Sequence, residues 1–73
     1  MMKLKVLLLP ESSGGYSASV PAMPGCHSQG ETYAEAMANI KEAADLWLEV
    51  VAERAAREAQ ASVPNAELQE IEL

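Results

Sequence analysis

Adjacent reactive side chains occur at one place in the sequence, where Cys26 is followed by His27. Together they suggest a thiol nucleophile beside a base. Neighbouring residues of a strand point to opposite faces of a sheet, so on a strand the two cannot form a hydrogen-bonded pair. One cysteine and one histidine are also too few for a zinc site built from such ligands. We therefore expect structural roles for both, and we predict no catalytic residue, no metal site and no cofactor.

A second group consists of three acids, Glu42, Asp45 and Glu49. Their i, i+3, i+7 spacing places them on one side of a helix, where carboxylates could bind Mg²⁺. They lie off the apolar stripe of that helix and beside other charged residues, so we interpret them as a solvated face. They are also the candidate residues for contact with a protein partner.

Acidic residues are concentrated in the second half of the chain. The 73 residues include 5 Lys and Arg and 11 Asp and Glu, a net charge of −6. Lys3, Lys5 and Glu11 give residues 1–30 a net of +1, and residues 31–73, with ten acids and three bases, have −7. This charge repels phosphates and argues against direct nucleic-acid binding. It favours a basic protein partner, although it serves solubility equally well.

The length and the apolar content limit the class of protein. A chain of 73 residues forms one small domain with a small core, so we expect a homo-oligomer. The apolar run before Pro10 is too short for a signal peptide or a membrane span. The single cysteine excludes an intrachain disulfide, which fits a reducing, cytoplasmic location.

Three strands are predicted in the first thirty residues. Residues 4–9 are apolar on both faces, so we expect a strand that is central or covered on both sides. Residues 16–20 alternate strictly, with Tyr16, Ala18 and Val20 inward, and form a hairpin with the first strand. Pro24-Gly25 suits the centre of a type II turn that leads into a short strand over 26–29.

A long helix is predicted to follow, from 32 or 33 to about 59–61. Thr32 and Glu35 form a capping box, in which the Glu35 carboxylate would reach back to the Thr32 N–H. The apolar residues share one helical face: Tyr33, Met37, Ile40, Ala44, Trp47 and Val51.

Charged pairs and helix length complete this prediction. Lys41–Asp45 and Glu53–Arg57 are i,i+4 pairs, and Pro64 ends the helix. At about 42 Å the helix is longer than its sheet, whose strands reach about 20 Å, so its alanine-rich end packs against something or stands in solvent. Apolar and acidic residues alternate at the end of the chain, with Ile71 and Leu73 on one face, which predicts a terminal strand over 66–73.

A longer pattern resembles the signature of the HicB-like antitoxin family. It covers roughly residues 4–49 and combines Val-Pro-x-x-Pro-Gly-Cys with Gly-x-Thr-x-x-Glu-Ala at a fixed spacing. The motif residues that we regard as structural are Tyr16, Pro21, Pro24, Gly25, Cys26, Gly30, Thr32, Glu35 and Trp47.

The resemblance implies a single domain over residues 1–73 with a partial ribonuclease-H-like α+β fold. The order would be β-β-β-α-β, an antiparallel sheet of three to four strands with one long helix on one face. The sheet would occupy residues 1–30, the helix 31–61 and a terminal strand 66–73. Typical members form dimers or tetramers.

The resemblance also implies a function. Typical members bind and mask a small basic mRNA-cleaving toxin of the HicA type and are not enzymes. Many members add a C-terminal DNA-binding module, and this sequence ends nine residues after Pro64 without one. The alternative is an orphan oligomeric scaffold, or a protein that binds a small ligand, without a toxin partner.

Overall fold

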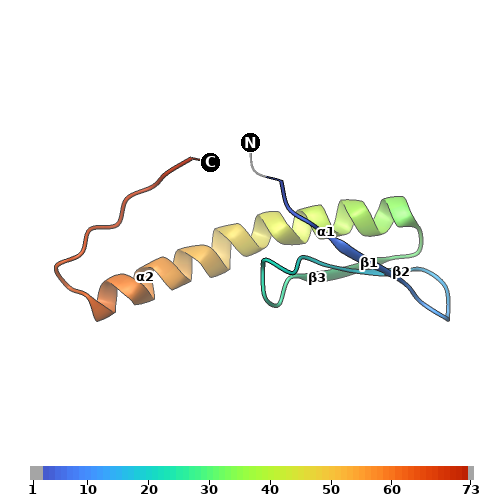
Figure 1. Ribbon diagram of the computed structural model, residues 1–73, viewed down its shortest axis with the longest axis horizontal. Helices are drawn as coiled ribbons and strands as arrows, with labels where there is room; N and C mark the ends of the chain where they lie inside the picture. Colours follow the sequence, from blue (N-terminus) through green and yellow to red (C-terminus); the bar gives the residue numbers. More distant parts are fainter. Residues whose placement is uncertain (1–2, 73) are drawn as a thin grey trace.

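The computed structural model describes residues 3–72, and its elements follow the predicted order. The strands are β1 (Leu7–Pro10), β2 (Tyr16–Ser19) and β3 (His27–Gly30). They form an antiparallel sheet in the order β1-β2-β3 (Figure 1). The predicted α+β class, with a three-stranded antiparallel sheet and one long helix, is confirmed.

The helical part is one rod that changes type near its middle. It consists of α1 (Tyr33–Trp47), the π-helical turn η1 (Leu48–Ala52) and α2 (Glu53–Ser62). The rod ends as predicted, because Val63, which precedes Pro64, leaves the helical region at φ −132° and ψ 80°. The π-helical turn was not predicted, and it adds a local break to an otherwise uninterrupted helix.

The core lies between one face of the sheet and α1. Helix α1 packs against β3 and β2. Ile40 of the helix and Ala18 of the sheet are buried, together with Val20, Met23 and Cys26. This confirms the inward side of the second predicted strand. The rod continues past the sheet, and the molecule extends over 52 × 24 × 15 Å (Figure 1).

The prediction that the first strand is central or covered on both sides is wrong. Strand β1 is an edge strand, and the helix covers only one face of the sheet. Leu7 and Leu9 point to the open face and are 64% and 58% exposed. Both faces of the strand are apolar, but this chain alone buries only one of them.

The predicted terminal strand is also not formed. Between α2 and residue 72 the chain has a turn and then an irregular segment with no strand partner. A strand needs a sheet edge to pair with, and the rod carries this segment away from the sheet (Figure 1). Residues 1–2 of the predicted sheet region and Leu73 of the predicted terminal strand lie outside the described residues.

Candidate partner-binding surfaces

The residues of the turn motif form the connection between β2 and β3. Cys26 donates its backbone N–H to the carbonyl of Met23 at 2.9 Å, and Gly25 has a φ of 85°. This is the type II geometry that Pro24-Gly25 predicted. The indole N–H of Trp47 donates to the Pro24 carbonyl at 2.9 Å, so the helix holds this turn against the sheet.

The junction between β3 and α1 depends on close approach. A Cβ atom on Gly30 would lie 2.8 Å from the carbonyl carbon of Glu35, so only glycine fits there. Thr32 Oγ1 accepts the N–H of Glu35 at 3.1 Å, as the capping box predicted. The Glu35 carboxylate, however, accepts from the N–H of Glu31 at 3.4 Å, one residue earlier than expected. The ring of Tyr33 meets that of Tyr16 edge to face, with centroids 5.9 Å apart.

Cys26 and His27 lie apart, as expected for neighbouring residues that point to opposite faces. Cys26 is buried in the core, whereas His27 is exposed on the opposite face of the sheet. Within residues 3–72 no three side chains of the His, Cys, Asp and Glu types gather closely enough to form a metal site.

The three acids of the candidate partner face are exposed. Glu42 and Asp45 lie on α1, and Glu49 lies on η1. Across residues 3–72 the ion pair that forms is Glu53–Arg57, with Oε1 and Nε 3.3 Å apart. The predicted Lys41–Asp45 pair is absent there, so both side chains remain open to other groups.

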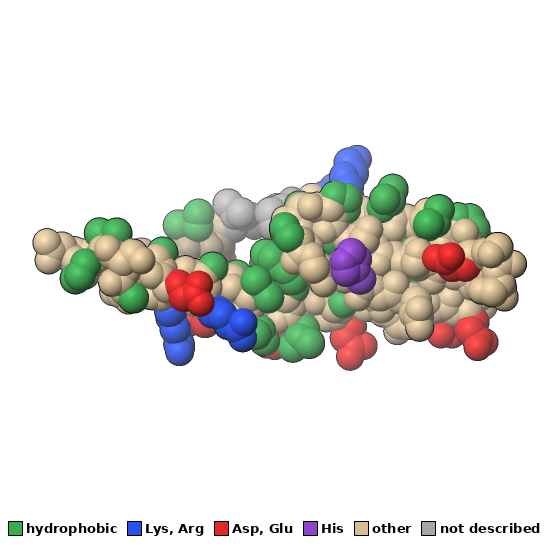
Figure 2. Space-filling view, turned by 90° about the horizontal axis from the view of Figure 1, so that it is seen from below, with side chains coloured by type: hydrophobic (Ala, Val, Ile, Leu, Met, Phe, Trp, Pro, Cys, Tyr) green, Lys and Arg blue, Asp and Glu red, His purple; other side chains and the backbone are tan. Residues whose placement is uncertain are grey.

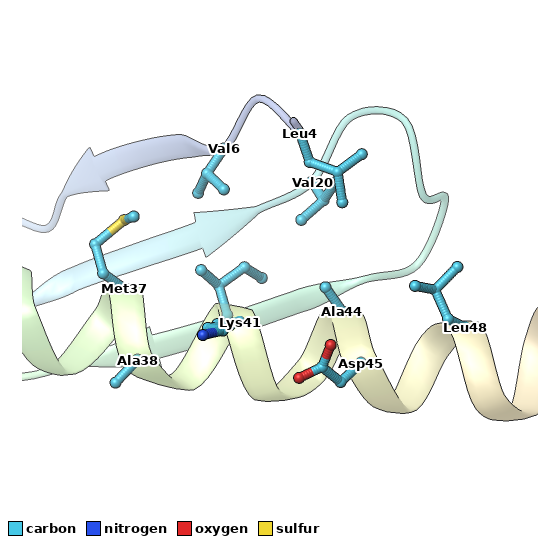
Figure 3. Close-up of a pocket in the computed structure, with 10 residues that line it drawn as sticks. Leu4, Val6, Val20, Met37, Ala38, Lys41, Ala44, Asp45 and Leu48 are labelled. Carbon is cyan, nitrogen blue, oxygen red and sulfur yellow. The ribbon is translucent and has the colours of Figure 1, made fainter. Parts of the chain in front are cut away.

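The surface that sequence reasoning missed is an apolar groove of about 640 Å³ between the N-terminal segment and the helix. In Figure 3, Leu4, Val6 and Val20 point toward the helix from the sheet side. Met37 and Leu48 point back from the helix, and Lys41 and Asp45 line the same groove (Figure 3). The groove exists because α1 covers β2 and β3 and leaves β1 uncovered. The two apolar faces of residues 4–9 were the only signal for it in the sequence.

A second apolar area lies where the rod leaves the sheet. Leu46, Leu48, Val50 and Val51 are between 39% and 58% exposed. Hydrophobic side chains gather near the middle of the molecule in the space-filling view (Figure 2). Apolar surface of this kind, beside an open groove, is typical of an interaction site. Within residues 3–72 no helix has the length and apolar character needed to cross a membrane.

The three-stranded antiparallel sheet, the long helix and the geometry of the two motifs agree with the α+β domain that the resemblance implies. The family model described as "HicB_like antitoxin of bacterial toxin-antitoxin system" matches residues 5–72. The chain therefore belongs to the HicB-like antitoxin family.

Relatives from distant organisms match part of the chain. A UPF0150 protein of Synechocystis sp. is 54% identical over 44 residues, which are 60% of this chain and 56% of that protein. A UPF0150 protein of Thermoplasma acidophilum is 46% identical over 48 residues, 66% of this chain and 70% of that protein. A third, from Helicobacter pylori, is 49% identical over 41 residues, 56% of this chain and 57% of that protein. No solved structure gave a significant match.

Proposed function

We propose that this protein is a non-enzymatic antitoxin that acts in the cytoplasm by binding and masking a small basic mRNA-cleaving toxin of the HicA type. The observation that carries the proposal is the family match over residues 5–72. Family membership supports an antitoxin-like role, and the basic toxin is the part that we add.

Charge supports a basic partner. Glu42, Asp45 and Glu49 lie exposed on the rod, where no ion pair with a described residue neutralises them. Residues 31–73 have a net charge of −7 and the first thirty residues have +1, which together give the total of −6. Such a field would speed encounter with a basic protein and would repel RNA, the substrate of such a toxin.

The test uses a HicA-type toxin with a short RNA substrate. Addition of the antitoxin at equimolar concentration is expected to stop RNA cleavage. Association of the two proteins should slow by about tenfold or more between 50 mM and 500 mM NaCl, since exposed charges are screened at high salt.

A charge-neutralised variant locates the toxin-binding face. Glu42→Gln, Asp45→Asn and Glu49→Gln together should slow association by about tenfold. The matched control, Glu11→Gln with Glu58→Gln and Glu67→Gln, removes the same charge from exposed positions elsewhere. Equal effects of the two triple variants would remove the rod face from the proposal, and unhindered RNA cleavage would contradict the antitoxin role itself.

The apolar groove and the exposed apolar residues near η1 favour one further property, a homo-oligomer of two or four copies. A scaffold or small-ligand protein without a toxin would share this property. Co-expression with a HicA-type toxin separates the two functions, because only the antitoxin restores growth.

A further inference from the structure

The segment over residues 66–72 has a strand-like sequence but no strand partner. All of its described residues are exposed, and Ile71 is 82% exposed. Glu70 and Glu72 alternate with Ile71, so in an extended conformation the two carboxylates would share one side and the isoleucine would take the other. An exposed, alternating segment of this kind can pair with an open sheet edge.

Strand β1 provides such an edge. The N–H of Glu11 donates to the Gly15 carbonyl across the hairpin at 3.0 Å. Backbone groups alternate in direction along a strand, so those of Leu8 point away from β2, toward the free edge. Residues 3–6 precede β1, and the same alternation continued into them turns Val6 the same way. Pro10 has the same outward direction and lacks an N–H, so pairing along this edge must be centred on residues 3–8 rather than on the end of β1.

The two faces of this edge match the two faces of the C-terminal segment. Lys3 and Lys5 are exposed on the open face, whereas Leu4 and Val6 line the groove on the helix side. A third cation, Lys41, lines the groove as well. Three of the five Lys and Arg residues thus surround this edge, and residues 64–73 contain three glutamates and no base.

We propose that residues 67–72 of one copy pair with residues 3–8 of a second copy as a fourth, antiparallel strand, and that the exchange is reciprocal. In the register that pairs the charges, Glu72 lies opposite Lys3, Glu70 opposite Lys5 and Leu68 opposite the exposed Leu7. On the groove side this register places Gln69 opposite Val6 and Glu67 opposite Leu8. Ile71 then enters the groove beside Leu4. Opposite charges and apolar pairs directly across two strands are the combinations that stabilise a sheet.

Geometry favours a second copy over the same chain. Leu68, Gln69 and Glu70 lie beside Glu53 and Ala56 of α2. Val6 lies in the groove with Ile40 and Ala44, about twelve residues earlier in the rod, which is about 18 Å at 1.5 Å per residue. Within one chain the segment therefore stops short of the edge while the rod stays helical.

Chain direction leads to the same conclusion. In Figure 1 the C-terminal segment and β1 both run from left to right, so pairing within one chain would be parallel. A twofold axis perpendicular to the rod reverses the direction of the partner's rod and strands, so pairing between two copies becomes antiparallel. If the axis passes near η1, the exposed side chains of Leu48, Val50 and Val51 from the two copies would also face each other.

The inference is independent of toxin binding, and a charge exchange between full-length chains tests it. Lys3→Glu with Lys5→Glu makes one variant, and Glu70→Lys with Glu72→Lys makes the other. In a dimer of either variant alone, residues of the same charge would face each other across both exchanged strands. Each variant should therefore dimerise at least about tenfold more weakly than the parent chain. In an equimolar mixture of the two variants, lysines again face glutamates across both exchanged strands. The mixture should therefore form a mixed dimer, which native mass spectrometry identifies.

The matched control for the second variant is Glu11→Lys with Glu31→Lys, the same change in charge at exposed positions far from the segment. It should leave dimerisation within about threefold of the parent, because it leaves every strand pair of the exchange intact. A parent chain that is monomeric at about 100 μM, or a mixture that forms no mixed dimer, would overturn the proposal.

A double variant, Leu7→Cys with Leu68→Cys, tests the register and the exchange together. Leu7 and Leu68 would form a non-hydrogen-bonded pair, whose Cα atoms are about 4.5 Å apart, within the range for a disulfide. The native Cys26 is buried, so it should not compete in the oxidation. Mild oxidation should give a covalent dimer in which both bonds join different chains. An oxidised monomer would show pairing within one chain, and a failure to cross-link would exclude this register.

Discussion

At the scale of single residues, the junction between the sheet and the helix has the tightest constraints. Gly30 ends β3, and three residues later the rod begins at Tyr33. The backbone of Ala36 passes directly over Gly30, and the N–H of Ala36 donates to the Thr32 carbonyl at 2.9 Å. A side chain at position 30 or the loss of the cap at position 32 would therefore move the helix relative to the sheet.

Gly30→Ala is expected to lower the free energy of unfolding by about 1–3 kcal/mol. The new Cβ atom would meet the backbone of Glu35 and Ala36, which cannot move without the helix. Chemical denaturation of the parent and the variant measures the change. Gln29→Ala, at an exposed neighbouring position, is the control and should stay within about 0.5 kcal/mol of the parent.

Thr32→Ala is expected to cost about 1 kcal/mol of stability, the usual loss for a removed N-cap. The hydroxyl that accepts the N–H of Glu35 disappears, whereas Thr32→Ser keeps it and should keep most of the stability. Thermal unfolding compares the three chains. Identical midpoints for the threonine and alanine forms would mean that the cap contributes nothing.

At the scale of elements, the two halves of the rod differ in how much of them is covered. Helix α1 contributes Ala36 and Ile40 to the core, and α2 contributes no buried residue. The π-helical turn lies between them and directly follows Trp47, which donates to the Pro24 carbonyl. An isolated helix of ten residues is only marginally stable in water, so α2 depends on α1 or on a partner.

Hydrogen exchange is expected to separate the two halves. Amides of α2 in dilute protein should exchange at least about tenfold faster than those of α1, because opening α2 exposes little apolar surface. Measurement by mass spectrometry at low and high protein concentration should show slower exchange of α2 at the higher concentration. Equal protection of α1 and α2 in dilute protein would contradict this expectation.

At the scale of the whole molecule, the sheet and the charges define what the protein can do. The open sheet face carries Leu7 and Leu9 beside polar residues, and the acids lie along the rod and the C-terminal segment. The groove lies between the N-terminal segment and the rod, and Asp45 of the acidic face borders it. One molecule thus has an acidic face, which we propose meets a basic partner, and an apolar, lysine-bordered edge, which we propose pairs with a second copy.

The purified protein is expected to show no metal-dependent RNA cleavage and no stoichiometric Zn²⁺. Metal-assisted hydrolysis needs carboxylates that converge on one point, and Glu42 and Asp45 are exposed on the rod instead. Incubation with labelled RNA in Mg²⁺ or Mn²⁺ and metal analysis check both expectations. Cleavage that disappears in Glu42→Ala or Asp45→Ala would refute them.

Much of the fold follows from local patterns. Alternation over residues 16–20 predicts the second strand, and the Pro24-Gly25 pair predicts the turn that follows it, because a positive φ at the third turn position favours glycine. The capping residue Thr32 marks the helix start and Pro64 marks its end. These features depend on a few neighbouring residues, so the sequence by itself determined them, together with the family and the acidic charge.

Other features depend on contacts between distant residues, and only the tertiary structure decided them. The position of β1 at the edge, the groove beside it and the exposure of Leu7 arise because α1 lies over β2 and β3. The missing terminal strand has the same origin, since the rod carries residues 66–72 beyond the edge that they would need. Alternation predicts that a segment can form a strand, but a strand forms only where a partner edge is within reach.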